Sequence, residues 1–91
     1  MPFTYQFSPQ SMTAAKYDDI IARLDAAGAG KPKGRLYHAC YGAPDDLRVF
    51  DVWDSPEDFE QFGKTLIPLL QELGVDAGTP AVAEIHNIIT G

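Results

Sequence analysis

LRVFDVWDSPEDFEQF, residues 47–62, joins a predicted strand directly to a predicted helix, and this junction decides the fold. Leu47 to Trp53 is an apolar strand interrupted by one acid, Asp51. Ser55 then occupies an N-cap position, with Pro56 suited to the first helical position. The apolar residues that follow recur at helical spacing: Phe59, Phe62, Leu66, Leu69, Leu70 and Leu73.

The residues before this junction predict three further elements. Strict alternation predicts a strand over Phe3–Ser8, ended by Pro9. A helix capped by Ser11 or Thr13 then carries an apolar stripe, and Gly28 ends it. Arg35–Tyr41 is a second predicted strand, and turn residues connect it in a hairpin to the strand of the junction.

The residues after the junction predict a long helix and a last strand. The helix runs from Pro56 to about Leu73, before Gly74. Pro68 falls inside this pattern and predicts a kink or a break near residues 64–67, since proline has no backbone N–H to donate. The last predicted strand is Val82–Thr90.

The resulting order, β-α-β-β-α-β, predicts an α+β fold with a single domain over residues 1–91. The expected architecture is a ferredoxin-like sandwich, in which two helices cover one face of a four-stranded antiparallel sheet. The second and third strands are mostly apolar on both faces, so the face without helices also needs a cover. The simplest cover is the same face of a second copy, which predicts a homodimer through the open sheet face.

The strand-to-helix junction also resembles a known family. Val49 to Ser55, followed by Phe59 and Phe62, is similar to the "V-W-E-S-x-E-x-F" junction of the dimeric α+β barrel superfamily, in the antibiotic-biosynthesis-monooxygenase-like group. Asp54 stands where that group more often has Glu. The resemblance implies a dimeric α+β barrel. It leaves the activity open, because the superfamily includes cofactor-free oxygenases, haem-degrading enzymes, isomerases and domains with no known activity.

Composition excludes several partners. The net charge is −6, and the only basic cluster is Lys31, Lys33 and Arg35 in a Gly/Pro loop, which is more typical of a solvated turn than of a nucleic-acid surface. No apolar stretch has the length of a membrane helix, and no signal peptide is visible, so we expect a cytoplasmic protein. Cys40 is the only cysteine, which excludes an internal disulfide, and it reads most simply as a small core residue.

His38 and Asp51 are the candidate catalytic residues. A hairpin turn centred on Pro44-Asp45 would place His38 opposite Asp51 and Leu36 opposite Trp53. Directly opposite residues share a face of the sheet, so Asp51 would orient His38 as a general base. We expect His38, Asp51 and Trp53 to point away from the helices. A register shifted by one residue would separate the pair, and a purely structural hydrogen bond is an equally good reading.

Aromatic residues and a second histidine complete the candidate site. Trp53, Tyr5, Tyr37 and His86 are the predicted substrate-binding residues, although each would also suit a core or an exposed strand. His86 alternates with Glu84 along the last predicted strand. A metal site from His38, Asp51, His86 and Glu84 lacks any local ligand spacing, so we predict no metal and no cofactor.

Two functions remain open from the sequence. The first is a small dimeric enzyme with an aromatic-lined pocket for a small apolar or aromatic molecule, resembling a cofactor-free monooxygenase or an isomerase. The alternative is a non-catalytic module of the same fold that binds a ligand or supports a partner.

Overall fold

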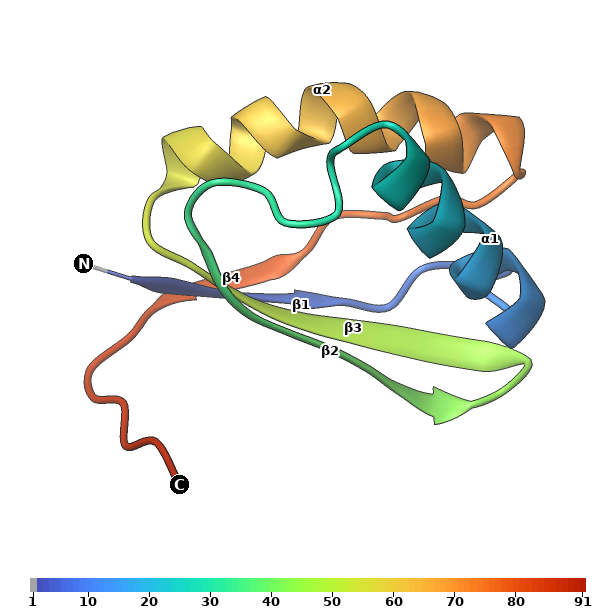
Figure 1. Cartoon of the computed structure of the whole chain (residues 1–91). Coiled ribbons are helices and arrows are strands. Elements are labelled where there is room, and N and C mark those ends of the chain that lie inside the picture. The colour runs from blue at the N-terminus through green and yellow to red at the C-terminus, as the bar shows by residue number, and fades with distance from the viewer. Residues whose placement is uncertain (1) are drawn as a thin grey trace.

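Figure 1 shows the computed structural model of the chain, which describes residues 2–91. The elements follow the predicted order, with the bounds β1 Phe3–Phe7, α1 Ala14–Ala26, β2 Arg35–Ala43, β3 Asp46–Trp53, α2 Pro56–Glu72 and β4 Ala81–Glu84. The strands form one antiparallel four-stranded sheet in the order β2-β3-β1-β4. Both helices lie on the same side of this sheet (Figure 1). The ferredoxin-like α+β sandwich expected from the sequence is therefore confirmed.

Both helices begin where their capping residues predict. The hydroxyl of Thr13 accepts a hydrogen bond from the backbone N–H of Lys16 at 3.2 Å, so Thr13 rather than Ser11 caps α1. The hydroxyl of Ser55 does the same for Asp58 at 3.2 Å. Each cap satisfies a backbone donor that has no partner within the helix.

Helix α2 is continuous across Pro68, so the predicted break does not occur. Proline removes only the hydrogen bond to the carbonyl of Lys64, and both residues lie on the exposed side of the helix. Water can solvate that carbonyl there, and the apolar stripe on the other side holds the helix against the sheet.

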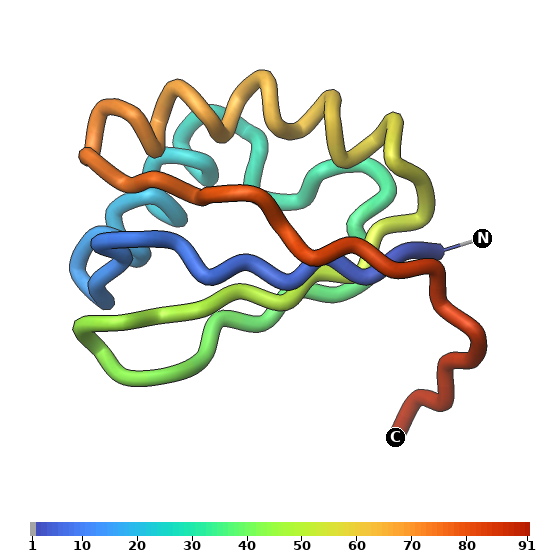
Figure 2. Tube along the Cα trace, turned by 180° about the vertical axis from the view of Figure 1, so that it is seen from behind, coloured from blue at the N-terminus to red at the C-terminus, as the bar shows by residue number. Residues whose placement is uncertain are grey.

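The last strand is shorter than predicted. β4 ends at Glu84, whereas the sequence pattern predicted a strand to Thr90. Its neighbour β1 begins at Phe3, which pairs with Glu84, and the last backbone bond of this pair runs from Ile85 N to Pro2 O at 2.9 Å. Among residues 2–91, no strand lies beside residues 86–91, which leave the sheet on the side away from the helices (Figures 1 and 2).

The hydrophobic core lies between the sheet and the helices. Trp53 is its most deeply buried residue, with 0% of its surface exposed. Its ring packs against Phe59 and Phe62 of α2, with ring centroids 5.6 Å and 5.5 Å away. The strand-to-helix junction therefore supplies both sides of this packing: the end of β3 and the first turns of α2.

Candidate active site

The β2–β3 hairpin places His38 directly opposite Asp51, as predicted. Cys40 and Val49, two residues nearer the turn, are likewise paired. The prediction that Leu36 opposes Trp53 is wrong. A bulge interrupts β2 between Arg35 and Tyr37, so Arg35 takes the place opposite Trp53.

The predicted orientation of this group is also wrong. His38, Asp51 and Trp53 were expected on the open face of the sheet, and they lie on the face that the helices cover. His38 contacts Tyr17 of α1, and Trp53 packs against α2. Alternation along a strand shows which residues share a face, but both faces of these strands are apolar, so the pattern did not show which face the helices cover.

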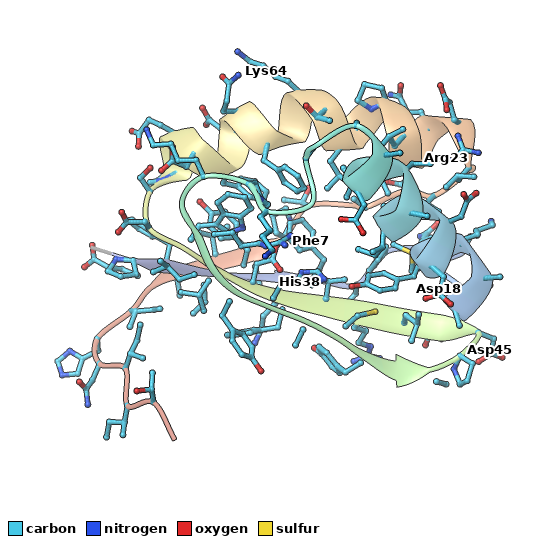
Figure 3. All side chains as sticks on the ribbon, viewed as in Figure 1. Phe7, Asp18, Arg23, His38, Asp45 and Lys64 are labelled. Atoms are coloured by element: carbon cyan, nitrogen blue, oxygen red, sulfur yellow. The ribbon has the colours of Figure 1, made fainter. Side chains whose placement is uncertain are left out.

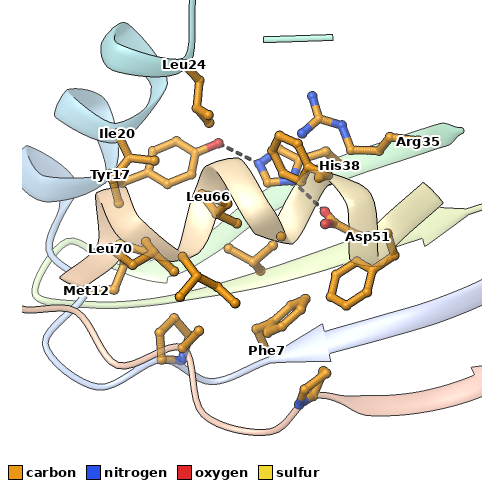
Figure 4. Close-up of a pocket in the computed structure, with 18 of the residues that line it drawn as sticks. Phe7, Met12, Tyr17, Ile20, Leu24, Arg35, His38, Asp51, Leu66 and Leu70 are labelled. Carbon is orange, nitrogen blue, oxygen red and sulfur yellow. Dashed lines mark hydrogen bonds and ion pairs between the residues drawn. The ribbon is translucent and has the colours of Figure 1, made fainter. Parts of the chain in front are cut away.

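A chain of hydrogen bonds joins four side chains from β2, β3 and α1, of which Figure 4 shows Tyr17, His38 and Asp51. Nδ1 of His38 lies 2.5 Å from Oδ1 of Asp51, and Nε1 of Trp53 donates to Oδ2 of the same carboxylate at 3.2 Å. The hydroxyl of Tyr17 lies 2.7 Å from Nε2 of His38. Both oxygens of Asp51, which is 5% exposed, are thus occupied, as a buried carboxylate requires.

The network assigns the hydrogen atoms. A carboxylate only accepts hydrogen bonds, so Nδ1 of His38 carries a hydrogen and donates it to Asp51. In the neutral imidazole, Nε2 then has a free electron pair and accepts a hydrogen bond from the Tyr17 hydroxyl. Burial raises the pKa of Tyr17, and the negative charge of Asp51 adds to this effect, so the phenol keeps its hydrogen at neutral pH.

Tyr17 is a member of this site that the sequence did not indicate. It falls on the apolar stripe of α1, where an aromatic residue usually fills the core. Only the packing of α1 over β2 brings its hydroxyl to His38, with the two rings nearly parallel at 4°. No local motif links positions 17 and 38, so no sequence signal could have found the pair.

The network forms part of the wall of a cavity of about 650 Å³ between the sheet and the two helices. Tyr17, His38 and Asp51 line it, together with Arg35. Most of the remaining wall is apolar and includes Phe59 together with residues labelled in Figure 4: Phe7, Met12, Ile20, Leu24, Leu66 and Leu70. Figure 3 shows Phe7 and His38 in the layer between the sheet and the helices. An apolar space with a few polar groups at one place is typical of small-molecule sites.

The predicted substrate-binding residues lie outside this cavity. Trp53 and Tyr5 are core residues, 0% and 4% exposed, and Tyr5 stacks on Phe59 with ring centroids 4.1 Å apart. Tyr37 is 58% exposed and lies on the open face, in contact range of Phe50. His86 is exposed in the segment after β4. The structure therefore brings together His38, Asp51 and Trp53, and leaves Tyr37 and His86 apart from them.

Within residues 2–91, no group of three or more His, Cys, Asp and Glu side chains is close enough to hold a metal ion. Cys40 lies on the same face as His38. Burial raises the pKa of its thiol, and the negative charge of Asp18 adds to this effect, so the thiol is protonated at neutral pH. No helix within the described part of the chain is long and apolar enough to cross a membrane.

Comparisons with known proteins agree on the fold. No family model and no curated protein matches the chain. Among solved structures, SnoaB, a cofactor-independent oxygenase from Streptomyces nogalater, is similar over 99% of this chain and 96% of its own, with 17% identity and a TM-score of 0.61. A provisionally assigned antibiotic biosynthesis monooxygenase from Deinococcus radiodurans is similar over 99% and 97%, with 16% identity and a TM-score of 0.62.

A protein of unknown function from Nitrosomonas europaea is also similar, over 99% of this chain and 90% of its own, with 12% identity and a TM-score of 0.56. The chain thus has the ferredoxin-like fold of the antibiotic-biosynthesis-monooxygenase-like proteins, and the resemblance expected from the strand-to-helix junction is confirmed at the level of the fold. Identities this low carry no residue roles from those proteins to this one.

Proposed function

We propose that the protein binds a small apolar or aromatic molecule in the cavity between its sheet and its helices, and that His38 acts on this molecule as a general base. The proposed reaction is a cofactor-free, monooxygenase-like oxidation. The observation that carries the proposal is a histidine oriented by a buried carboxylate in the wall of an apolar cavity of about 650 Å³. A cofactor-independent oxygenase with the same fold supports the choice of reaction.

The hydrogen-bond chain sets out a route for the proton. The ligand's acidic proton passes to the oxygen of Tyr17, while the hydroxyl proton of Tyr17 moves to Nε2 of His38. Asp51 stabilises the resulting imidazolium through Nδ1. Tyr17 is neutral before and after this step, and the ligand becomes an anion. Trp53 fixes the other oxygen of Asp51 and so holds the carboxylate in position.

An anthrone, a tricyclic aromatic ketone, is a suitable probe for this chemistry. Its CH₂ group next to the aromatic rings loses a proton to a base, and the carbanion reacts with O₂. One oxygen atom becomes the new carbonyl and the other leaves as water, so the four electrons that the CH₂ group loses reduce one O₂. We expect catalysed oxygen uptake with the wild-type protein, and a loss of about 10²-fold or more in His38→Gln.

The outcomes separate the two candidate functions. Binding of the anthrone with equal, background oxygen uptake in both proteins would favour the non-catalytic ligand-binding module over the enzyme. Shifts of backbone NMR signals around the cavity report binding independently of turnover. A protein that shows neither shifts nor turnover with any aromatic probe would contradict both the enzyme and the ligand-binding module, and would leave only a module that supports a partner.

A homodimer through the open face of the sheet is the second part of the proposal. This face carries exposed aromatic residues, with Tyr37 58% and Tyr41 47% exposed, and Phe50 beside them. Ile88 and Ile89, in the tail beyond β4, are 49% and 85% exposed. They line a hollow on this face together with Tyr37 and Phe50. Apolar surface of this kind on a chain of 91 residues favours burial against a partner.

Charge favours a second copy as that partner. The chain has a net charge of −6, but the side chains that alternation assigns to this face on β1, β2 and β3 carry only one acid, Asp46 at the turn, and one base, Arg48, so their charges balance. Two copies can therefore face one another without the repulsion that the rest of the surface would cause. We expect a buried area above about 1,200 Å². Light scattering that finds only the monomer mass at micromolar concentration would contradict the dimer.

A further inference from the structure

Arg35 reaches the cavity because of the bulge in β2. In a regular strand, residues 35 and 38 would lie on opposite faces, since their separation is odd. The bulge leaves Leu36 without a partner, so Arg35 opposes Trp53 and His38 opposes Asp51. Trp53 and Asp51 are two residues apart and share a face, which places Arg35 on the same face as His38 (Figure 4). Bulges commonly redirect a side chain beside a functional site in this way.

The guanidinium of Arg35 has no carboxylate partner. It is half-buried and lines the cavity. Nη2 donates to the carbonyl oxygen of Gly30 at 3.0 Å, and the group lies 5.8 Å from the ring centroid of Phe62. The ion pairs found among residues 2–91 involve Arg23, Lys33 and His38, but not Arg35. Guanidinium has five N–H donors, and only the one to Gly30 has a hydrogen-bond acceptor among residues 2–91, so the others can bind a ligand.

The buried acid of the cavity wall, Asp51, already has a hydrogen-bond donor on each oxygen. Asp51 accepts from His38 on one oxygen and from Trp53 on the other. The remaining ionisable groups of the cavity wall, Glu60 and Lys64, are exposed on α2. A half-buried cation without a counter-ion favours an anion at its free donors, and guanidinium matches carboxylate or phenolate oxygens particularly well.

We infer that Arg35 is the binding group for an anionic oxygen on the ligand of this cavity. The inference rests on the proposed function, because it requires a ligand there, and it adds the ligand's chemical class: an aromatic or apolar molecule with one anionic oxygen. That oxygen belongs either to a carboxylate or to a hydroxyl that loses its proton through Tyr17 and His38. In both cases Arg35 stabilises the negative charge while Asp51 stabilises the imidazolium.

Three probes of similar size test the assignment: 2-naphthoate, its neutral counterpart 2-naphthalenemethanol, and 2-naphthol. Binding is followed by NMR on isotope-labelled protein, and each probe is titrated into the wild type, Arg35→Gln and Arg48→Gln. Arg48 is the matched control, because it is exposed on the neighbouring strand and points to the open face. We expect Arg35→Gln to lower the affinity for 2-naphthoate about tenfold or more and to leave the affinity for 2-naphthalenemethanol unchanged. Arg48→Gln should change neither.

The wild type gives a second readout that does not depend on how well Arg35→Gln folds. The side-chain Nε–H signal of Arg35 should shift with 2-naphthoate and remain in place with 2-naphthalenemethanol. The third probe identifies the source of the charge. An affinity for 2-naphthol that rises as the phenol ionises, in the wild type only, indicates an ionised hydroxyl, whereas a preference confined to 2-naphthoate indicates a carboxylate.

Two results would overturn the inference, and they are distinguishable. Equal affinity for the charged and neutral probes, with signals of the cavity residues shifting in both cases, would contradict the role of Arg35 and leave the proposed function intact. No shift of cavity signals with any of the three probes would contradict the proposed function, and the inference with it.

Discussion

The two faces of the sheet carry similar apolar and aromatic residues, but these residues are buried on one face and exposed on the other. On the helix-covered face, Trp53 is 0% exposed and Asp51 5% exposed, and aromatic rings pack around them. On the open face, Tyr37 and Tyr41 are 58% and 47% exposed and carry no hydrogen bond to another side chain among residues 2–91. Both faces of β2 and β3 are rich in apolar and aromatic residues, so composition alone does not separate them.

The difference lies in what covers each face. Two helices cover one side incompletely, which leaves a cavity beside a polar network, while nothing within residues 2–91 covers the middle of the other side (Figure 1). We therefore expect changes on the covered face to act on folding stability and ligand binding, and changes on the open face to act on association.

The largest effect is expected when one aromatic residue is removed from the helix-covered face, and the matching change on the open face gives the comparison. Phe62→Ala removes a ring that packs against Trp53 in the core and should lower the free energy of unfolding by about 3–5 kcal/mol. Tyr37→Ala on the open face should change it by about 0.5 kcal/mol or less in the monomer, and should weaken the dimer instead. Urea denaturation and light scattering measure the two effects. Equal losses of stability would mean that the faces do not differ as described.

The next effect concerns the buried carboxylate. Asp51→Asn puts an NH₂ group next to one of the two donors, His38 or Trp53, and should cost about 1.5–3 kcal/mol. Where the NH₂ group faces His38, NMR of the imidazole nitrogens should show that His38 no longer holds its hydrogen only on Nδ1; where it faces Trp53, the indole Nε1–H signal should shift instead. Asp46→Asn, at the exposed start of the same strand, is the control and should do neither. An unchanged His38 tautomer together with an unchanged indole signal in Asp51→Asn would contradict the buried hydrogen-bond network on which the proposed proton route depends.

A smaller effect tests how the covering helices begin. Ser55→Ala removes the N-cap of α2 and should cost about 1 kcal/mol. Thr13→Ala removes the equivalent bond of α1 and is expected to cost a similar amount. Thermal or urea denaturation of both variants gives the comparison. A loss as large as that of Phe62→Ala would show that these hydroxyls do more than cap a helix.

The smallest expected effect is a pH dependence due to Tyr17. Burial raises the pKa of Tyr17 above the usual 10.0, so above that pH the unfolded chain loses the proton more readily than the folded one. The contribution of Tyr17 to the free energy of unfolding should therefore be complete below about pH 10 and be lost as the pH rises through the raised pKa. Tyr17→Phe should reduce this fall, and the buried Tyr5, whose pKa burial also raises, accounts for part of what remains.

Unfolding midpoints between about pH 8 and about pH 11 measure this dependence. Tyr41→Phe, on the open face, is the matched control, and its curve should follow that of the wild type. A curve for Tyr17→Phe that also follows the wild type would contradict the burial of the phenol beside His38.

Particular residues show how far the sequence could predict the fold and the site. Ser55 and Thr13 cap their helices because a cap depends on the next three residues alone. His38 opposes Asp51 because a short turn sets the register of a hairpin. Arg35 escaped prediction because the bulge lies at the far end of that hairpin, where a register counted from the turn takes no account of it. The catalytic roles of His38 and Asp51 stay predictions.

Local rules in the sequence thus determined the order of elements, the helix starts, the hairpin register and the pairing of His38 with Asp51. The tertiary structure decided which face of the sheet the helices cover, that Tyr17 meets His38, and that β4 ends at Glu84, which pairs with the first residue of β1. The reason is physical. Caps, turns and alternation act over a few residues, whereas these outcomes depend on packing between elements far apart in the chain, and two equally apolar faces carry no signal that tells them apart.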